Sequence, residues 1–450
     1  MQGGERKNKL EQTSVGKLMI ELCFQTTFSI MLYNFYIITD TFFVAKGIGS
    51  EASGAIGVFS PFLVLVGGIS STLGTGGGSI ISRRLGENNT EDGKKVVGCI
   101  MWIWYVCALV ITIAGLVGID PLLKLLGCTT ELYPYAKVYG KIMIIGVVTT
   151  TGFSGIMRAE GDSTYSTFQW CGPVIVNLLF DPLLIYTFKM GIAGAAVATL
   201  MAQLVSMGSS IYYFFIRKHT PCRVTLKDIK WDGEIAKEIF YIGIPAFLNS
   251  LGGSFTGIMG NQIIGKVGGT IAISTYAIVS RFIGFIGTPF SGLMQGIQPM
   301  LGFDWGRKNK KRIEKTIHYA VSFSLIYGGV VTVMSYLGAE WIIKIFSSDP
   351  KLLGSGTSAL RIIGWSLAIG GIMPIAQGFY QALGKGKMVF VLSLMSILCI
   401  RLPLIGLSGF ANNLQVVWFI FVLIDWIIAS MAFYFLNKGR KQFYGEFNKE

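Results

Sequence analysis

The chain has 450 residues, of which 52% are hydrophobic and only 14% are charged, and its net charge is +14. Soluble domains carry about 25% charged residues, so a chain this apolar is not expected to cover its surface in water. Its long uncharged runs predict membrane-spanning helices of about 20 residues each. They do not suit a β-barrel, whose strands alternate in polarity. The basic residues stand in loops between these runs, which argues against a nucleic-acid partner.

Hydropathy along the chain predicts twelve spans, and therefore an all-α integral membrane protein. The second span is long and rich in glycine, so we expect it to tilt or bend. The predicted spans cover residues 18–45, 52–81, 96–118, 132–156, 163–188, 192–216, 235–262, 270–300, 316–338, 356–381, 388–409 and 413–436.

Lys and Arg are distributed unevenly between the two ends of these spans. Of the 38 basic residues, 27 fall on the side of the N-terminus, 8 on the opposite side and 3 inside spans. Cytoplasmic loops carry the excess of positive charge, and an even number of spans places both termini on one side. We therefore expect a multi-pass protein of the cell (plasma or inner) membrane with both termini in the cytoplasm.

The two halves of the chain repeat one pattern. SRRLGENN after the second span resembles FDWGRKN after the eighth, and RAEGD after the fourth resembles QALGK after the tenth. Three aligned pairs keep nearly the same spacing along the chain, namely Gly86 with Gly306, Gly161 with Gly384, and Pro182 with Pro403. These pairs predict a duplicated six-span unit in parallel orientation. We expect an N-lobe over residues 1–216, a cytoplasmic linker over 217–234 and a C-lobe over 235–450, a plan typical of transporters.

No motif predicts an enzyme or a nucleotide site. GTGGGS at residues 74–79 lacks the following Lys-Ser/Thr of a phosphate-binding loop, and it favours close helix packing instead. The seven cysteines form no C-x-x-C pair, and the two histidines form no cluster. We therefore expect no resident cofactor and no nucleotide.

Ionisable residues inside spans are costly and usually functional. Asp40 lies in the first predicted span four residues after Tyr36, and Asp181 lies in the fifth four residues after Asn177, so each pair shares a helix face. With Thr199 of the sixth span they predict an oxygen-rich site for a coupling ion. That ion is either a hard cation such as Na⁺ at Asp40, Asp181 and Asn177 or a proton shared by the two carboxylates. The alternative is that each aspartate pairs with a helix terminus or a basic residue.

The charged residues of the C-terminal half allow two interpretations each. Arg401 and Asp425 form either a buried pair within the lobe or two interfacial charges. Arg281 lies in mid-span. It either faces a central cleft between the two lobes or binds the carbonyls of a helix end. The abundant aromatic residues and methionines suit flat organic cations, through cation–π contacts and soft packing.

At these residues the chain resembles the multidrug and toxic compound extrusion (MATE) transporters of prokaryotes, over nearly its whole length. The resemblance rests on LYNFYIITDTFFVAKGIGSEASGAIGVFSP, SRRLGENN, GFDWGRKN, RAEGDS and VNLLFDPLLI. It implies twelve helices in two pseudo-symmetric six-helix lobes that form a V-shaped central cleft. It also implies cation-coupled antiport of organic, often cationic, compounds by alternating access. It places Tyr36, Asp40, Asn177, Asp181 and Thr199 at the cation site of the N-lobe.

The chain departs from the family pattern in two places. The stretch ELCFQTTFSI in the first span has no proline, with Gln25 near the place where many relatives carry one. The stretch IPAFLNSLGGSFTGIMGNQ of the seventh span and the stretch GWSLAIGGIMPIAQGFY of the tenth contain no acidic residue, so a carboxylate site in the C-lobe is not supported. Arg281 would favour anionic or zwitterionic cargo. Neutral contacts to a substrate are predicted for Asn249, Asn261, Gln262, Gln295 and Gln377.

The sequence therefore predicts a Na⁺- or H⁺-coupled antiporter that exports small organic, mainly cationic, drugs or metabolites, and that works as a monomer among membrane lipids. The choice between Na⁺ and H⁺ stays open, because both ions use the same carboxylates. The first alternative is a flippase of a lipid-linked or anionic substrate, which needs a cleft lined by basic residues. The second is a membrane-embedded enzyme, which needs a catalytic cluster that the sequence does not show.

Overall fold

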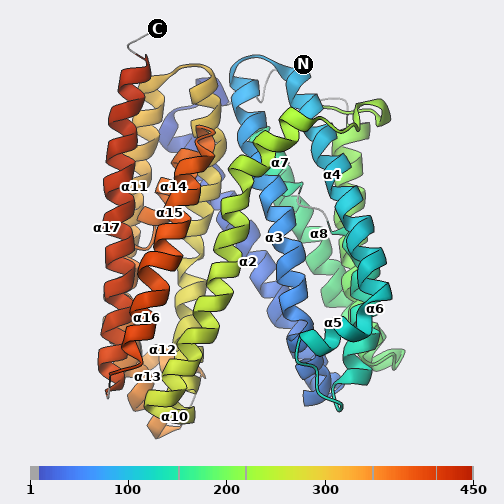
Figure 1. Cartoon of the computed structure of the whole chain (residues 1–450), viewed down its shortest axis with the longest axis vertical. Coiled ribbons are helices and arrows are strands. Elements are labelled where there is room, and N and C mark those ends of the chain that lie inside the picture. Colours follow the sequence, from blue (N-terminus) through green and yellow to red (C-terminus); the bar gives the residue numbers. More distant parts are fainter. Residues whose placement is uncertain (1–9, 151–152, 218–219, 347–348, 412, 448–450) are drawn as a thin grey trace. The chain divides into compact units, whose positions relative to one another are not determined.

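The structure, a computed structural model, describes residues 10–150, 153–217, 220–346, 349–411 and 413–447, and this part of the chain contains helices and no strand (Figure 1). The α-helices are α2 (Val15–Gly47), α3 (Ser50–Gly86), α4 (Thr90–Val117), α5 (Ile119–Leu125), α6 (Tyr133–Gly146), α7 (Ser154–Ala159), α8 (Ser163–Pro182), α9 (Ile192–Ile211), α10 (Gly233–Gly306), α11 (Lys310–Leu337), α12 (Ala339–Phe346), α13 (Pro350–Ile363), α14 (Ile372–Ala382), α15 (Gly386–Leu394), α16 (Leu402–Ser408) and α17 (Leu414–Phe447).

The predicted spans are present as helices. Eleven of the described helical stretches are long and apolar enough to cross a membrane. One of them, α10, has 74 residues and joins two spans at Gly269, where φ is 66° and the backbone leaves the helix. Gly269 falls in the predicted gap between the seventh and eighth spans, so the expectation of twelve spans is confirmed. The short helices α5 and α12 lie between spans and were not expected.

Several spans consist of successive helical pieces, whereas the first is one continuous helix. α8 ends at Pro182 and continues as a π-helical turn over Leu183–Thr187. A second π-helical turn, Met395–Arg401, lies directly before α16, which carries Pro403 in its first turn. Proline lacks the N–H that an α-helix needs, and these two wider turns lie next to a proline, whereas a further π-helical turn over Tyr212–Ile216 after α9 does not. α2 contains no proline and runs unbroken for 33 residues.

The backbone repeats as the sequence does. α4 and α11 both have 28 residues, and they begin at corresponding positions of the two repeats. Each is capped by an asparagine, Asn89 or Asn309, whose side chain accepts a hydrogen bond from the backbone N–H three residues on. The residues before these caps, Asn88 and Lys308, both have positive φ, at 64° and 56°. The duplication thus extends to the conformation of single residues.

The chain divides into two compact units. Unit 1 comprises residues 1–13 and 28–247, and unit 2 comprises residues 14–27 and 248–450. The beginning of α2 therefore belongs to unit 2, and the beginning of α10 belongs to unit 1. This division reflects which residues contact each other in space. The predicted lobe boundaries, which follow the order of the spans along the chain, stay a prediction.

In unit 1, α3 and the beginning of α10 approach each other at small residues. A Cβ atom added at Gly76 would collide with the main-chain oxygen of Ile239, and one added at Gly243 would collide with the main-chain oxygen of Thr72. The two partners on each helix are four residues apart, and on α3 the pair Thr72 and Gly76 has the small-xxx-small spacing of closely packed membrane helices. Only glycine permits this contact between backbones.

In unit 2, the beginning of α2 also packs closely against glycines of α10. Cys23 and Thr27, one turn apart, lie against Gly296 and Gly292 of α10. The thiol of Cys23 also donates to the main-chain oxygen of Leu293 at 3.8 Å. Cys23 therefore acts as a small packing residue at this contact.

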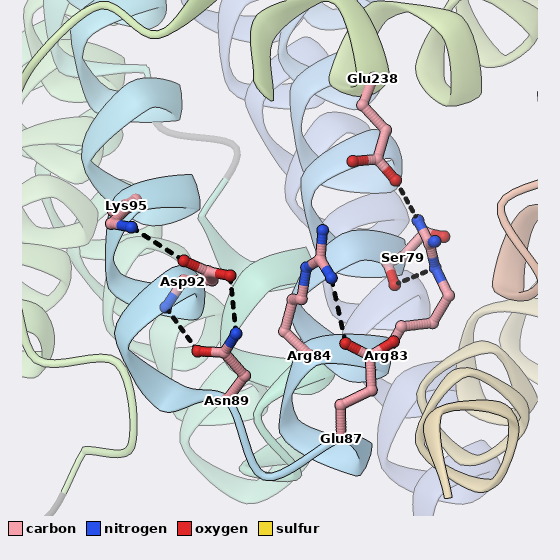
Figure 2. A network of polar contacts seen from close by, with 8 residues as sticks. All are labelled: Ser79, Arg83, Arg84, Glu87, Asn89, Asp92, Lys95 and Glu238. Atoms are coloured by element: carbon pink, nitrogen blue, oxygen red, sulfur yellow. Dashed lines mark hydrogen bonds and ion pairs between the residues drawn. The ribbon is translucent and has the colours of Figure 1, made fainter. Parts of the chain in front are cut away.

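An ion pair adds to the contact of α3 with α10 (Figure 2). Arg83 of α3 donates to Glu238 of α10 at 2.8 Å, and its Nε donates to the main-chain oxygen of Ser79 at 3.2 Å. Arg84 pairs with Glu87 at 3.1 Å in the same turn. The basic loop motif after the second span thus has a structural role within unit 1.

We predict that Gly76→Val lowers the thermal stability of the purified protein, because the added side chain would push the backbones of α3 and α10 apart. Overpacking of this kind costs about 1–3 kcal/mol. Gly67→Val on the same helix is the matched control, because a Cβ at Gly67 meets nothing within 4 Å. Melting curves in detergent measure both variants, and equal melting temperatures would contradict the contact.

Candidate functional site

The five residues predicted for an ion site all lie in unit 1. Tyr36 and Asp40 come from α2, Asn177 and Asp181 from α8, and Thr199 from α9. Asn177 and Asp181 are 0% exposed and Thr199 is 5% exposed. The Asp40 carboxyl lies beside Asp181 and Asn177, and Tyr36 lies beside Thr199. The structure thus brings together residues that are far apart in the sequence.

Small residues and one hydrogen bond hold α2, α8 and α9 together at this place. A Cβ at Gly194, early in α9, would touch the backbone of Leu184 in the π-helical turn after α8. Gly47 at the end of α2 lies against Ile185 and Tyr186 of the same turn. The Tyr186 hydroxyl donates to the main-chain oxygen of Phe43 at 3.2 Å. The π-helical turn next to Asp181 therefore contacts both neighbouring helices.

Most polar atoms of this cluster have no hydrogen-bond partner among the described residues. They are Oδ1 of Asp40, both oxygens of Asp181, both polar side-chain atoms of Asn177 and Oγ1 of Thr199, and all are buried. An unsatisfied buried polar group costs about 1–3 kcal/mol, and native proteins contain few of them. Six such atoms in one place indicate a site that a ligand or a proton completes.

The donor set suits a hard cation or a proton. Carboxylate, amide and hydroxyl oxygens are the ligands that hard cations prefer, and two adjacent carboxylates can also share a proton. Among the described residues, no group of three or more His, Cys, Asp and Glu side chains gathers to hold a metal ion. The cluster therefore does not resemble the nitrogen and sulfur sites of zinc or copper.

Sequence reasoning missed one neighbour of the cluster. Tyr139 of α6 is 3% exposed and lies close enough to Asp40 and Asp181 to interact with both carboxylates. Its ring meets the ring of Phe59 edge-on, with the centroids 5.9 Å apart. No carboxylate at helical spacing singles out Tyr139 in the sequence, so only the packing of α6 reveals it.

The residues predicted to contact substrate lie in unit 2, and the structure places them in different surroundings. Gln377 is 7% exposed and donates to the Ser393 hydroxyl at 3.2 Å, so it contributes to the packing of α14 on α15. The exposed residues are Arg281, Asn261 and Gln262, and the half-buried ones are Asn249 and Gln295. Their contact with a substrate stays a prediction.

Arg401 and Asp425 form a pair within unit 2, as one of the two interpretations expected, but the pair is only partly buried. The guanidinium of Arg401 donates to Asp425 Oδ1 at 2.8 Å, which joins the π-helical turn before α16 to α17. Each side chain is about one-third exposed. The charges of these two residues therefore balance each other within unit 2.

The RAEGD motif forms a buried polar turn between α7 and α8. Glu160 accepts a hydrogen bond from the Tyr213 hydroxyl at 2.9 Å, and Asp162 caps α8 by accepting from the backbone N–H of Tyr165 at 3.1 Å. Asp162 also pairs with Arg217 at 2.9 Å. The motif therefore ties the start of α8 to the segment after α9, and it fixes the helix that carries the aspartate of the ion site.

The sequence profile of the MatE family matches the chain twice, over residues 26–183 and 245–406. The chain belongs to the MatE family. The two matched segments follow one another along the chain and are nearly equal in length, which agrees with the internal repeat of the MatE chain. The family consists of membrane transporters, so this MatE protein is a multi-pass transporter and not an enzyme.

Known proteins resemble this MatE chain over nearly its whole length. Multidrug export protein MepA of Staphylococcus saprophyticus is 26% identical over 411 residues, which cover 91% of this chain and 90% of MepA. A solved structure described as MATE in complex with MaL6 matches with a TM-score of 0.91 at 23% identity, covering 97% and 99% of the two chains. A MOP superfamily transporter from Pyrococcus furiosus, described with a binding pocket of reverse polarity, matches with a TM-score of 0.89 at 23% identity, covering 97% and 98%. The predicted twelve-helix fold is therefore confirmed.

We predict that Thr199→Val weakens Na⁺ binding to the purified protein several-fold, because the substitution keeps the shape of the side chain and removes one oxygen ligand. Isothermal titration with NaCl, at constant ionic strength, measures the affinity. Thr41→Val is the matched control, since Thr41 lies on α2 and its hydroxyl bonds the main-chain oxygen of Ile37 in its own helix. Equal Na⁺ affinity in wild type and Thr199→Val would remove Thr199 from the site.

Proposed function

We propose that this chain exports small organic, mainly cationic, compounds by antiport coupled to Na⁺ or H⁺. The observation that carries the proposal is the buried cluster of Asp40, Asn177, Asp181 and Thr199, in which six polar side-chain atoms have no hydrogen-bond partner among the described residues. The name of MepA, multidrug export protein, supports the choice of substrate. Because unit 1 contains all residues of the predicted ion site, we propose that a monomer is sufficient for coupling.

The two carboxylates explain how an ion changes this site. When both are charged and the site holds no ion, Asp40 and Asp181 repel each other in a buried place. A cation or a proton between them removes the repulsion and draws α2 towards α8. An ion drives transport only if it binds the two conformations of the transporter with different affinity. In this mechanism, ion entry from outside favours the conformation that releases the exported compound.

The neutral oxygens favour Na⁺ over H⁺. A proton shared by two carboxylates needs only their oxygens, and it leaves Asn177 Oδ1 and Thr199 Oγ1 unsatisfied. A sodium ion takes several oxygen ligands and satisfies these two as well. We therefore propose Na⁺ as the coupling ion, with H⁺ as the alternative that the experiment below distinguishes.

A flippase of lipid-linked or anionic substrates is less well supported. It needs basic residues that are free to bind phosphate, and three arginines lie within the spans. The charge of Arg401 is balanced by Asp425. Arg361 contacts Tyr336, the penultimate residue of α11, so it lies near the end of a span. Of the three, Arg281 alone is then predicted to lie in mid-span without a described ion pair, and one mid-span arginine makes a poor binding site for a substrate with several phosphates.

Proteoliposomes that contain the purified protein test the proposed antiport. An inward Na⁺ gradient alone is expected to drive efflux of a fluorescent organic cation, and a pH gradient alone is expected to drive little. Asp40→Asn should abolish uphill efflux, because the variant keeps the shape of Asp40 and lacks its charge. Glu51→Gln, an exposed carboxylate at the start of α3, is the control and should transport as wild type does.

Three results would change the proposal. Efflux driven by the pH gradient and lost in Asp40→Asn would identify H⁺ as the coupling ion. Normal coupled efflux by Asp40→Asn would remove the cluster from the mechanism. Transport of anionic but not cationic compounds would favour the flippase or an anion exporter.

We also propose that both termini lie in the cytoplasm, as the excess of basic residues on that side indicates. Cys128, between α5 and α6, then faces outward, and a membrane-impermeant maleimide added to intact cells should label it. Burial raises the pKa of the Cys128 thiol, so labelling should become faster as the pH rises. Cys222 should stay unlabelled because it is fully buried and its thiol pKa is raised well above the usual value.

A cysteine-free protein with single cysteines restored permits this labelling. Lys227→Cys, at an exposed place in the loop before α10, serves as the cytoplasmic control and should react only in inverted vesicles. Labelling of Lys227→Cys in intact cells would reverse the proposed orientation.

A further inference from the structure

Unit 2 contains a cavity of about 660 Å³ where α11, α12, α13 and α17 meet. Its lining combines one guanidinium, from Arg361, with three large rings, from Tyr336, Trp365 and Phe419. The rings are 48%, 50% and 60% exposed. Cavities of this size hold small ligands or the polar part of larger ones. Neither the proposed ion site nor the residues predicted to contact substrate include any of these side chains.

The guanidinium of Arg361 has capacity for an anion. Its Nε donates to the main-chain oxygen of Tyr336 at 3.4 Å, and its carbon lies 5.7 Å from the centre of the Tyr336 ring. Among the described residues, no carboxylate forms an ion pair with it. The carboxylate in the lining, Glu340, forms its ion pair with Lys344 of its own helix at 2.6 Å and is near enough to Arg361 to interact with its charge without an ion pair. The terminal nitrogens of Arg361 are therefore available to oxygens from outside the chain.

At the corresponding position of the first repeat, an ion pair joins the two helices. When the two repeats are aligned on their shared motifs, Asp120 corresponds to Glu340 and Lys137 corresponds to Thr357. Asp120 pairs with Lys137 at 2.7 Å and accepts a hydrogen bond from the Tyr133 hydroxyl at 2.6 Å, so α5 is tied to α6. In unit 2 a threonine replaces the lysine, and Oγ1 of Thr357 is buried without a hydrogen-bond partner in the described chain.

The position of the cavity favours a lipid over a soluble anion. α11 and the stretch Pro350–Ala382 are apolar enough to span a membrane, and Tyr336 lies one residue before the end of α11. Tyr and Trp side chains gather at the level of lipid headgroups. Trp341 of α12, which follows the lining residue Glu340 in the sequence, is 78% exposed. Arginine binds phosphate through paired N–H donors, and the exposed rings of Trp365 and Phe419 offer an apolar surface to acyl chains.

We propose that this cavity binds an anionic phospholipid, with its phosphate on Arg361 and its acyl chains along Trp365 and Phe419. The buried Thr357 hydroxyl is positioned to donate to the same headgroup. The site is separate from transport chemistry, and its occupant belongs to the surrounding membrane.

Native mass spectrometry of the detergent-purified protein tests this proposal. Dioleoyl phosphatidylglycerol and dioleoyl phosphatidylcholine are titrated separately, and the dissociation constant of the first bound lipid is measured. Wild type is expected to prefer phosphatidylglycerol. Arg361→Ala should weaken phosphatidylglycerol binding about tenfold, to the level of phosphatidylcholine, and Arg361→Lys should have an intermediate affinity because it keeps the charge and loses the paired donors.

Lys141→Ala is the matched control, because Lys141 occupies the position of Arg361 in the first repeat and is also exposed. It should bind phosphatidylglycerol as wild type does. Soluble glycerol phosphate at the same concentration should not compete, because it lacks acyl chains. Equal phosphatidylglycerol affinity in Arg361→Ala and Lys141→Ala would overturn the proposal. Full competition by glycerol phosphate would overturn it too, and would identify a site for soluble phosphate esters.

Discussion

Close approach of helix backbones at small residues is the constraint on which the rest of this structure depends. Helices in a membrane gain little by burying apolar side chains against each other, because lipid is equally apolar. The described helices therefore meet where glycine removes the side chain, as Gly76 does against Ile239 and Gly194 does against Leu184. The second of these contacts holds α9 against the turn that follows Asp181. The position of the ion site thus follows from a packing rule that involves no charge.

The sequence was informative wherever a single helix carries the information. Span positions follow from hydropathy, and the pairs Tyr36 with Asp40 and Asn177 with Asp181 follow from helical spacing. That these pairs meet was proposed because buried carboxylates need partners or ligands, and the family resemblance placed them at one site. The structure then brings Asp40 and Asp181 together without any basic partner in the described chain.

The rest depends on contacts between helices that are distant in the sequence. Tyr139 joins the cluster only because α6 packs beside α3 and α9, and no spacing in its own span indicates this. The cavity around Arg361 forms only where α11, α12, α13 and α17 meet. The sequence cannot show this meeting, and it shows only an arginine in an apolar stretch. The short helices α5 and α12 escaped a search for long apolar runs, because they have only seven and eight residues. Gln377 shows that a polar residue in a span can also take part in helix packing, since it donates to Ser393, and its contact with a substrate stays a prediction.

The two repeats share their backbone and differ in their chemistry. In the alignment of the repeats, Gly260 stands in the place of Asp40 and Leu402 stands in the place of Asp181. The carboxylate pair is therefore confined to the first repeat, whereas the cavity that contains Arg361 lies in the second. Duplication supplied the same frame twice, and different side chains then gave each copy its own binding properties.

Because the two repeats share their backbone, the residue at a position in one repeat suggests a stabilising substitution at the equivalent position in the other. Lys308 adopts a left-handed conformation, which costs an ordinary L-residue roughly 1–2 kcal/mol, and the first repeat has Asn88 at the equivalent position. Asparagine tolerates this conformation because its short side chain can bond the local backbone. Comparing the two repeats position by position therefore identifies residues that the same backbone already accepts. Such substitutions can raise the thermal stability of the protein in detergent.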